Sequence, residues 1–409
     1  MRVYLVGGAV RDQLLGHPYH EKDYVVVGST PQKMLDQGYQ PVGRDFPVFL
    51  HPKTKEEYAL ARTERKQGQG YHGFEFYTDP SVSLEQDLIR RDLTINAIAQ
   101  DDKGNLYDPY GGAQDIQNKV LRHVSDAFIE DPLRVLRVAR FAARYAQYGF
   151  TVAKETLVLM QTLAESGELQ CLTPERVWKE TSRALMEKHA DVYFEVLRQC
   201  GALKVLFPEI DALFGVPQRP EYHPEIDCGL HTLMSLQQAC QKNYSLDVRF
   251  AVLVHDLGKA LTPADVLPRH IMHEQRGIEP VSILCERLKV PSATKQFALI
   301  VCKEHLKCHQ AMTLKGGTLW RLLQRLDVLR RPERVVEFIQ ACECDARGRL
   351  GLENRPYPQK DYLLKAIECV RNIKAKDLPS DVKGPDIGEQ LIKKRIYELD
   401  QLKRSQQET

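Results

Sequence analysis

The pattern of the first twenty-seven residues constrains the fold of this chain more than any other feature. An apolar run at 2–6 meets Gly7-Gly8, a short helical pattern follows at 9–15, and a second apolar strand ends near residue 27. Glu21 and Asp23 lie two positions apart on this strand, so their side chains point to the same face. The pattern predicts two strands and a short helix, with a glycine pair after the first strand and paired carboxylates on the second.

These residues have a chemical interpretation. A glycine pair after a strand brings backbone N–H groups close to phosphates, because no Cβ is in the way. Two carboxylates on one face are suited to hold Mg²⁺ on a triphosphate. The combination favours a nucleotidyl transfer site. Taken alone, however, a turn followed by a solvated acidic strand edge would explain the same residues.

Length and composition leave room for several domains. At 409 residues the chain exceeds the roughly 250–300 residues at which single cores stop growing, which predicts two to four domains. A net charge of +2 neither demands nor excludes a nucleic-acid partner. We expect no membrane span and no signal peptide, because no apolar run approaches the roughly 18 residues required. All ten cysteines follow residue 170 without a CxxC pair, which favours a cytoplasmic location.

Hydrophobic periodicity divides the chain into an α+β head and a long all-α body. Head strands are predicted at 2–6, 23–28, 47–51, 56–62 and 105–107, and head helices at 9–15, 31–37 and 84–99. The polar, glycine-rich segment 62–73 is interpreted as a mobile loop. We predict a small head with a mixed sheet at 1–125, a helical neck at 126–222, a helical bundle at 223–348 and a helical tail at 349–409.

Three further motifs are rich in arginine. Arg11 lies one turn into the helix after the glycines, where its guanidinium could bind a triphosphate bidentately. The run from Arg90 to Asn96 places two arginines, an aspartate and an asparagine on the predicted 84–99 helix, suited to triphosphate and ribose hydroxyls. In the segment 130–144, arginines recur every three residues beside an apolar helix face. Each motif alone could be a solvated helix face.

Taken together, the motifs resemble those of bacterial CCA-adding enzymes, class II tRNA nucleotidyltransferases of the polymerase-β superfamily. Gly-Gly-x-x-Arg-Asp, the acidic pair, Arg-Arg-Asp-x-Thr-x-Asn-Ala and Glu-Asp-x-x-Arg occur in family order and spacing within about the first 180 residues. The resemblance implies a nucleotidyltransferase head that adds CMP, CMP and AMP to the tRNA 3′ end without a nucleic-acid template. It implies Mg²⁺ as cofactor, and tRNA, CTP and ATP as partners of a monomer or homodimer.

By this resemblance Glu21 and Asp23 are the catalytic Mg²⁺ ligands. The nucleotide contacts are Gly8, Arg11, Arg91, Asp92, Asn96, Asp131, Arg134, Arg137 and Arg140. Asp131 would accept from the exocyclic amine of cytosine or adenine, and Arg134 would donate to the neighbouring ring acceptor. Uracil and guanine present a carbonyl instead, which a carboxylate repels. Glu21 stands where the family usually has Asp, so its longer side chain could lower activity, and Glu57 is a candidate helper carboxylate.

Histidines indicate a second site. Seven of the thirteen histidines lie between 223 and 309. His255-Asp256-Leu257-Gly258-Lys259 follows an apolar helical run, and His231 lies on the preceding predicted helix. Neutral imidazoles beside a carboxylate suit divalent transition metals. This constellation resembles the HD phosphohydrolase superfamily, whose fold is a helical bundle with a metal in its core.

The second resemblance implies that His255 and Asp256 are catalytic. The implied metal ligands are His231, His255, Asp256 and a later aspartate, for which Asp345 is the candidate. Contacts to the ligands or to a phosphate are expected from His270, His273, His305 and His309. The family link implies 2′,3′-cyclic phosphodiesterase, 2′-nucleotidase and phosphatase activities, and an imidazole-rich site favours Ni²⁺, Co²⁺ or Mn²⁺ over Mg²⁺.

Three alternatives remain at this point. A poly(A) polymerase of the same superfamily shares every head motif and differs in nucleotide choice and tail length. An HD-type (p)ppGpp synthetase–hydrolase also joins nucleotidyl chemistry to an HD domain but places the HD domain first. An RNA-binding protein with a decayed catalytic pocket would explain Glu21, although the intact arginines and Asp131 argue against it.

Overall fold

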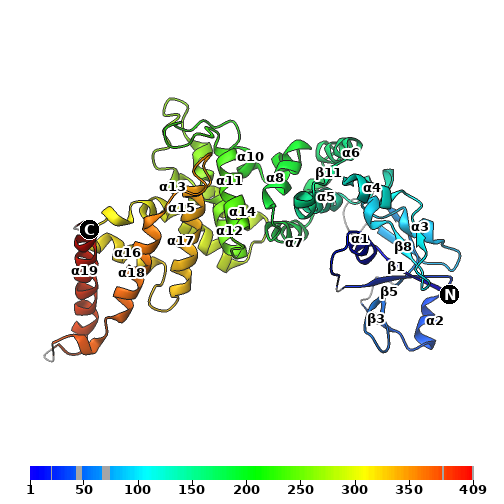
Figure 1. The fold of residues 1–409 in the computed structure, drawn as a ribbon, viewed down its shortest axis with the longest axis horizontal. Coiled ribbons are helices and arrows are strands. Elements are labelled where there is room, and N and C mark those ends of the chain that lie inside the picture. The colour runs from blue at the N-terminus through cyan, green and yellow to red at the C-terminus, as the bar shows by residue number, and fades with distance from the viewer. Residues whose placement is uncertain (20, 43–47, 67–73, 380–381, 408–409) are drawn as a thin grey trace. The chain divides into compact units, whose positions relative to one another are not determined.

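The computed structural model describes residues 1–19, 21–42, 48–66, 74–379 and 382–407 (Figure 1). The chain forms two compact units: Met1–Ala184 with Val192–Leu206, and Leu185–Asp191 with Phe207–Thr409. Within the described ranges, no helix has the length and apolar character of a membrane span. The finer division at residues 125, 222 and 348 stays a prediction.

A mixed seven-stranded sheet forms the core of the head, in the order β3-β4-β5-β2-β1-β8-β9. The strands are β1 (Arg2–Val6), β2 (Asp23–Val27), β3 (Gln40–Val42), β4 (Val48–Leu50), β5 (Glu57–Leu60), β8 (Ala99–Gln100) and β9 (Leu106–Tyr107). Val25 and Val27 pack in one buried cluster with Tyr4, while Val26 packs in another with Leu60. Because side chains alternate along a strand, these clusters cover the two faces of the sheet, as expected for a sheet with helices around it.

The predicted helix 84–99 is wrong. The short helix α3 (Leu84–Leu88) ends early, and one 3₁₀ turn at Thr94–Asn96 precedes β8. Leu93 is extended and bridges His123, and the Thr94 N–H donates to the carbonyl of Arg122 at 2.8 Å. The Thr94 hydroxyl also donates to Asp115 at 2.7 Å. The hydrogen bonds of Thr94, a β-branched residue, to distant parts of the chain therefore outweigh the helical sequence pattern of 84–99.

The predicted loop 62–73 is wrong at its start. An antiparallel pair, β6 (Thr63–Lys66) and β7 (Phe74–Tyr77), begins within it and ends beyond it, and residues 67–73 lie outside the described residues. The loop prediction for 62–73 rests on its polar side chains. Backbone pairing satisfies N–H and C=O groups whatever the side chains are, so polarity did not exclude a strand.

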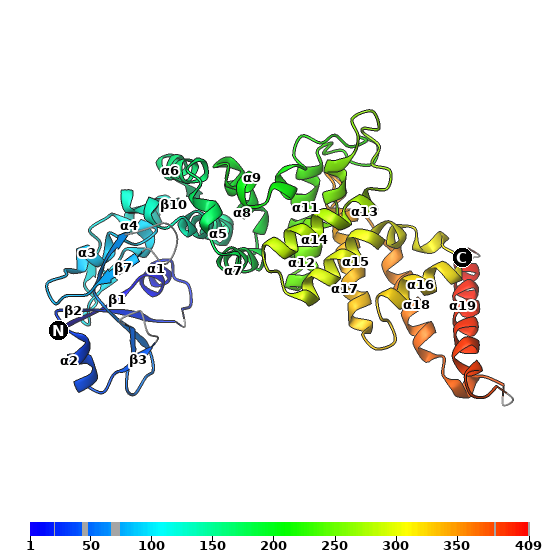
Figure 2. The same ribbon diagram turned by 180° about the vertical axis from the view of Figure 1, so that it is seen from behind.

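The first unit continues as a set of helices around α5 (Figure 2). Helices α1 (Gly8–Leu14) and α2 (Pro31–Asp36) lie between strands of the sheet. The elements after the sheet are α4 (Gly112–Asn118), β10 (Val120–Leu121), α5 (Leu133–Tyr145), β11 (Thr151–Val152), α6 (Lys154–Glu165), α7 (Pro174–Leu185), α8 (Ala190–Gln199) and α9 (Ala202–Leu206). Helix α5 buries Val135, Leu136 and Val138, and also Arg134 and Arg140. Buried guanidinium groups require partners, so this helix does not carry a solvated arginine stripe.

The second unit is helical, and α11, α12, α15 and α17 pack against one another as its core. Its helices are α10 (Pro208–Asp211), α11 (Cys228–Gln241), α12 (Leu246–Val254), α13 (His273–Arg276), α14 (Ile278–Arg287), α15 (Ser292–His309), α16 (Gly316–Arg325), α17 (Pro332–Arg347), α18 (Pro358–Asn372) and α19 (Asp386–Gln407). Helix α12 ends at Val254, and a 3₁₀ turn at Leu257–Leu261 follows it. A Cβ on Gly258 would overlap the His273 carbonyl oxygen, so α13 packs directly against this turn.

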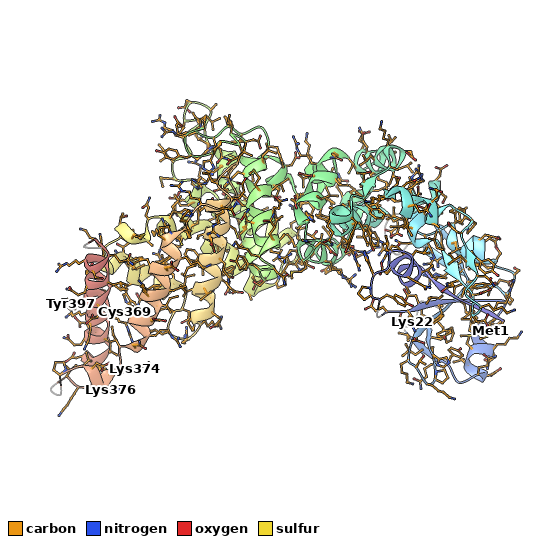
Figure 3. All side chains as sticks on the ribbon, viewed as in Figure 1. Met1, Lys22, Cys369, Lys374, Lys376 and Tyr397 are labelled. Atoms are coloured by element: carbon orange, nitrogen blue, oxygen red, sulfur yellow. The ribbon has the colours of Figure 1, made fainter. Side chains whose placement is uncertain are left out.

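Helices α16, α18 and α19 pack together at the end of the chain. Figure 3 labels Tyr397 on α19 and Cys369 on α18. Arg395 of α19 is buried, lies over the ring of Trp320 at 5.2 Å and donates to the Val370 carbonyl at 3.1 Å. These contacts hold α19 against its neighbours through an arginine rather than through apolar packing alone.

Candidate active sites

The glycine pair and the predicted carboxylates lie together at one end of the central strands. Gly7 has a φ of 69°, in the left-handed region that favours glycine, and Gly8 begins α1. Val6, directly before the pair, is the register partner of Asp23 on β2. Arg91 packs on the same turn, since a Cβ on Gly7 would lie 2.9 Å from its guanidinium. Cationic and acidic groups thus surround one backbone turn.

Three exposed carboxylates lie at this end of the sheet: Glu21 precedes β2, Asp23 begins β2 and Glu57 begins β5. Asp23 and Glu57 are register partners on the parallel strands β2 and β5, which places Glu57 on the neighbouring strand as predicted. The pKa of the Asp23 carboxyl group is raised above its usual value. Desolvation by the surrounding protein and the negative charge of Glu21 raise this pKa, and together they outweigh Arg91, which lowers it. Exposed carboxylate oxygens beside a phosphate-binding turn are a donor set that Mg²⁺ prefers.

A continuous chain of polar contacts links Arg11 on α1 to Arg137 on α5. Arg11 donates to Asn96 Oδ1 at 2.6 Å, and Asn96 Nδ2 donates to Asp92 Oδ1 at 2.9 Å. Arg137 Nε donates to Asp92 Oδ2 at 2.8 Å. Burial raises the pKa of Asp92, but Arg137 and the Asn96 hydrogen bond outweigh burial and lower it. The 92–96 turn therefore joins two arginines from separate helices.

The guanidinium of Arg11 is fixed on every side. It forms two hydrogen bonds of 2.9 Å to Asp12. It also lies over the rings of Phe141 and Tyr145, at 5.4 and 5.3 Å from their centroids, and Tyr145 donates its hydroxyl to Asp12 at 3.1 Å. A side chain held this way needs little reorganisation to meet a ligand.

Two carboxylates that pair with arginines of this site were not predicted from the sequence. Asp87 is fully buried and contacts Arg91 at 3.3 Å and Arg90 at 2.8 Å. Glu180 of α7 accepts from Arg140 at 2.6 Å. The available signal was charge, because an arginine that is buried needs an anionic or polar partner.

The two residues predicted to select the base have different side-chain partners. Asp131, directly before α5, contacts Arg176 of α7 at 3.2 Å. Arg134 donates instead to two backbone carbonyls, those of Ala127 at 2.7 Å and Arg90 at 2.6 Å. Arg176 was not predicted from the sequence; it lies one helical turn before Glu180 on α7.

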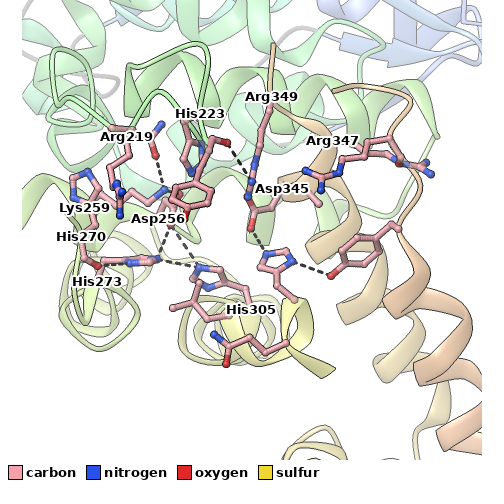
Figure 4. A pocket seen from close by; sticks show the side chains of 18 of the residues that line it. Arg219, His223, Asp256, Lys259, His270, His273, His305, Asp345, Arg347 and Arg349 are labelled. Atoms are coloured by element: carbon pink, nitrogen blue, oxygen red, sulfur yellow. Dashed lines mark hydrogen bonds and ion pairs between the residues drawn. The ribbon is translucent and has the colours of Figure 1, made fainter. Parts of the chain in front are cut away.

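The second unit brings the four predicted metal ligands together; Figure 4 labels two of them, Asp256 and Asp345. His231 Nε2 lies 3.0 Å from Asp345 Oδ1 and 3.8 Å from Asp256 Oδ2. His255 Nε2 lies 3.2 Å from Asp256 Oδ2 and 3.7 Å from Asp345 Oδ1. These side chains come from α11, the end of α12 and α17, so three core helices supply one centre.

The chemistry of this donor set fits a divalent cation. His255 Nδ1 lies 2.7 Å from the Val252 carbonyl, and His231 Nδ1 lies 2.9 Å from that of Gly348. A carbonyl can only accept, so each Nδ1 carries the proton and each Nε2 presents a lone pair to the centre, as in metal-binding histidines. Among the described residues, His255 Nε2 is buried without a hydrogen-bond partner. Glu225, at 3.1 Å from His231 Nδ1, is a supporting carboxylate that the sequence reasoning missed.

Electrostatics also favour positive charge at this centre. Burial lowers the pKa of His255, but the carboxylates of Asp256 and Asp345 outweigh burial and raise it to about 10. Both aspartates are buried, and nearby histidines hold the pKa of each well below its usual range, with Lys259 contributing at Asp256. Two ionised carboxylates in a buried site require cations.

A pocket of about 790 Å³ opens onto this centre. It is lined by Asp256 and Asp345, by His270, His273, His305 and His309, and by basic side chains that include Arg219, Lys259 and Arg349. Lys259 Nζ lies 2.6 Å from Asp256 Oδ2. The pocket therefore combines metal-ligand chemistry with cationic groups that suit an anionic substrate.

Comparisons with known proteins agree with this architecture. Residues 3–122 match a family model described as the poly A polymerase head domain, and residues 149–214 match one described as a probable RNA and SrmB-binding site of polymerase A. The multifunctional CCA protein of Acinetobacter baumannii (strain AYE) is 77% identical over 407 residues, covering 100% of this chain and 99% of that protein. The multifunctional CCA protein of Pseudomonas fluorescens is 60% identical over 397 residues, 97% of each chain.

Solved structures share the fold. A CCA-adding enzyme in apo form II has a TM-score of 0.65 at 21% identity, covering 98% of this chain and 88% of that one. The Thermotoga maritima CCA-adding enzyme complexed with tRNA has a TM-score of 0.62 at 21% identity, covering 98% and 87%. Since full-length relatives are far above the identity at which a family is established, the chain belongs to the multifunctional CCA protein family of CCA-adding tRNA nucleotidyltransferases.

Proposed function

We propose that the first unit adds or repairs the 3′-terminal CCA of tRNA from CTP and ATP, without a nucleic-acid template. The observation that carries this proposal is the meeting of three segments: the Gly7-Gly8 turn beside Asp23, the 92–96 turn, and the arginines of α5. Full-length relatives named multifunctional CCA proteins support the same activity. The protein would act in the cytoplasm as a monomer or homodimer.

In this proposal Glu21 and Asp23 hold Mg²⁺, which when bound lowers the pKa of the attacking hydroxyl and neutralises triphosphate charge. Arg11 and Arg91 bind the triphosphate beside the Gly8 N–H, because both guanidinium groups lie at the glycine turn. Asp92 and Asn96 orient the ribose. Their contacts to Arg11 and Arg137 keep the 92–96 turn in one arrangement.

Base selection is proposed to rest on Asp131 and Arg134, supported by Arg137 and Arg140. Asp131 is oriented through its contact with Arg176, so it can accept from an exocyclic amine. The carbonyls that hold Arg134 leave other guanidinium N–H groups to donate to a base, since arginine has five. A carbonyl at the amine position, as in uracil or guanine, would face the Asp131 carboxylate and be repelled.

We propose that the second unit is a metal-dependent phosphohydrolase with 2′,3′-cyclic phosphodiesterase, 2′-nucleotidase and phosphatase activities. His231, His255, Asp256 and Asp345 would hold a transition metal, Ni²⁺, Co²⁺ or Mn²⁺, which when bound activates water and polarises the phosphoryl oxygen. Lys259 and the arginines of the pocket would bind phosphate oxygens. This half would clean damaged RNA ends before the first unit rebuilds them.

Extension of a tRNA that lacks CCA tests the head. The purified chain is incubated with this tRNA, Mg²⁺ and each nucleoside triphosphate singly and combined, and the 3′ ends are sequenced. We expect C, C and A followed by a stop, and no extension by Asp23→Ala. An uninterrupted run of A would instead indicate a poly(A) polymerase, to whose head-domain family model residues 3–122 match.

Hydrolysis of 2′,3′-cyclic and 2′-phosphate substrates tests the second unit in the same preparation. We expect activity with Ni²⁺, Co²⁺ or Mn²⁺ that is lost in His231→Ala and retained in Asp23→Ala. Loss of CCA addition with intact phosphate release would mean that the head is inactive and only the second unit works.

A further inference from the structure

The pocket of the second unit differs in character between its buried and its exposed lining. The buried lining is ionisable and includes Asp256, Asp345 and Lys259. The exposed lining carries large apolar side chains among basic ones, and two of these, Tyr222 and Ile271, are 57% and 59% exposed. Three exposed prolines belong to the same lining: Pro268, Pro356 and Pro358. Exposed apolar side chains gathered at one pocket mark a place where the apolar part of a ligand binds.

The pocket is also larger than a phosphoryl group requires. Its volume of about 790 Å³ falls in the range of roughly 300–1,000 Å³ found for pockets that enclose a whole organic ligand. A phosphoryl group at the four-ligand centre would fill only a small part of this space. The remainder can hold the organic group to which the phosphate is esterified.

Tyr222 offers an open aromatic ring in this space. The guanidinium of Arg219 lies over the ring, 5.1 Å from its centroid, and a cation in this position is attracted to the ring face. The backbone of Tyr222 is held on both sides, because its N–H donates to the Arg219 carbonyl at 3.1 Å and its carbonyl accepts from Arg349 at 3.3 Å. The ring is therefore exposed but supported, with surface left open to a ligand.

A single guanidinium group separates Tyr222 from the four-ligand centre. Arg349, which Figure 4 labels beside Asp345, donates through NH1 to the Tyr222 carbonyl, and its NH2 lies 3.7 Å from Asp345 Oδ1. In a nucleotide, the ribose alone separates the base from a phosphate on its 2′ oxygen. A nucleotide whose phosphoryl group reaches Asp345 would therefore bring its base close to Tyr222.

We propose that Tyr222, supported by Arg219, is a stacking platform for the nucleobase of the substrate. The ligand class is a ribonucleotide with a 2′-phosphate or a 2′,3′-cyclic phosphate, either free or at the end of an RNA chain. The inference deepens the proposed phosphohydrolase function and rests on it. Stacking tolerates any base, because every base has a π face. This tolerance suits an enzyme that acts on RNA ends of different sequence.

Steady-state kinetics of the full-length chain with Ni²⁺ test the platform. The substrates are adenosine and uridine 2′,3′-cyclic phosphate, and inorganic phosphate serves as a competitive inhibitor that has no base. We expect Tyr222→Ala to raise KM for the adenosine substrate by ~10-fold with kcat unchanged, the order expected for the loss of one stacked base. KM for the uridine substrate should rise less, because its ring is smaller, and the inhibition constant of phosphate should not change.

Two further variants separate stacking from other roles of the residue. Tyr222→Phe should retain the natural KM, because stacking needs the ring and not the hydroxyl. Tyr397→Ala is the matched control, since Tyr397 is 60% exposed on α19 and lies outside the pocket (Figure 3). An unchanged KM in Tyr222→Ala, an equal rise in the inhibition constant of phosphate, or an equal loss in Tyr222→Phe would each overturn the platform.

An oligoribonucleotide that ends in a 2′,3′-cyclic phosphate forms the second arm of the test. Tyr222→Ala should raise KM for this substrate as well, because the terminal nucleoside occupies the same place. A change confined to the mononucleotides would overturn the role of the platform at RNA ends. If the natural chain hydrolyses none of these substrates with Ni²⁺, Co²⁺ or Mn²⁺, the phosphohydrolase proposal itself fails, so the two failures are distinguishable.

Discussion

The carboxylate of Asp131 lies 3.2 Å from the guanidinium of Arg176, a residue of a different helix. Two hydrogen bonds of 3.3 and 3.2 Å join the Arg176 NH2 group to both oxygens of Asp131. The proposed base-selecting carboxylate is thus oriented by α7 as well as by its own motif, in which the Leu133 N–H donates to Asp131 Oδ1 at 3.1 Å.

Removal of Arg176 should weaken base selection. We expect Arg176→Ala to lower kcat/KM for CTP and ATP by ~10-fold, because a charge-assisted hydrogen bond contributes about 1.5–3 kcal/mol, reduced here by the partial exposure of the pair. Incorporation of UTP relative to CTP should rise. Single-nucleotide extension kinetics measure both effects, with the exposed Lys179→Ala on the same helix as control. An unchanged ratio of CTP to UTP would refute a role for this contact in selection.

Glu57 should assist the two predicted Mg²⁺ ligands. Its register position opposite Asp23 predicts that Glu57→Gln raises the Mg²⁺ concentration needed for half-maximal CCA addition by a few-fold. Glu56→Gln is the matched control, because Glu56 lies next in sequence, points to the other face of the strand and contacts Lys22 at 3.7 Å. Equal Mg²⁺ dependence in the two variants would exclude the helper role.

Breaking the Asp92–Arg137 ion pair should destabilise the first unit. We expect Asp92→Asn to lower the free energy of unfolding by ~2 kcal/mol, less than the ~3–5 kcal/mol of a fully buried pair. The expected loss is smaller than for a fully buried pair because the Arg137 side chain is 36% exposed, and solvent screens the interaction. Urea denaturation followed by circular dichroism measures the change, and the exposed Asp102→Asn should leave it near zero. CCA addition should fall at the same time.

The acid stability of the head should depend on Asp87. Burial raises the pKa of Asp87, but Arg90 and Arg91 outweigh burial and hold it below its usual 3.8. Because the folded pKa is the lower one, this stabilisation is present above the unfolded pKa and disappears as the pH falls through the folded pKa. The free energy of unfolding of the natural chain should therefore decline below about pH 4, and that of Asp87→Asn should decline less steeply. Matching slopes between pH 5 and pH 2 would contradict this assignment.

Metal replacement should separate the two activities. After treatment with a chelator, we expect Mg²⁺ to restore CCA addition but not hydrolysis of cyclic phosphates, because imidazole ligands favour transition metals over Mg²⁺. Ni²⁺, Co²⁺ or Mn²⁺ should restore hydrolysis in the natural chain but not in His255→Ala, which should lose at least ~100-fold. Recovery of hydrolysis by Mg²⁺ alone would argue against the proposed donor set.

The sequence predicted best where local pattern and chemistry agree. The strands around Gly7-Gly8 and Asp23, and the helices that carry His231 and Asp345, lie where periodicity indicated. It failed at 84–99, where a helical pattern competes with tertiary hydrogen bonds to Thr94. Local propensity differences are a few tenths of a kcal/mol per residue, so such contacts outweigh them.

By itself, the sequence determined the kind of chemistry: paired carboxylates after a glycine turn, arginines for a triphosphate, and histidines with aspartates for a metal. Only the tertiary structure decided which charges are partners. It pairs Asp131 with Arg176 rather than with an arginine of its own motif, and it turns His273 and His305 toward Asp256 Oδ1. The reason is physical, because a buried charge or lone pair is satisfied by whichever group the fold brings within about 3 Å, and sequence spacing does not encode that distance.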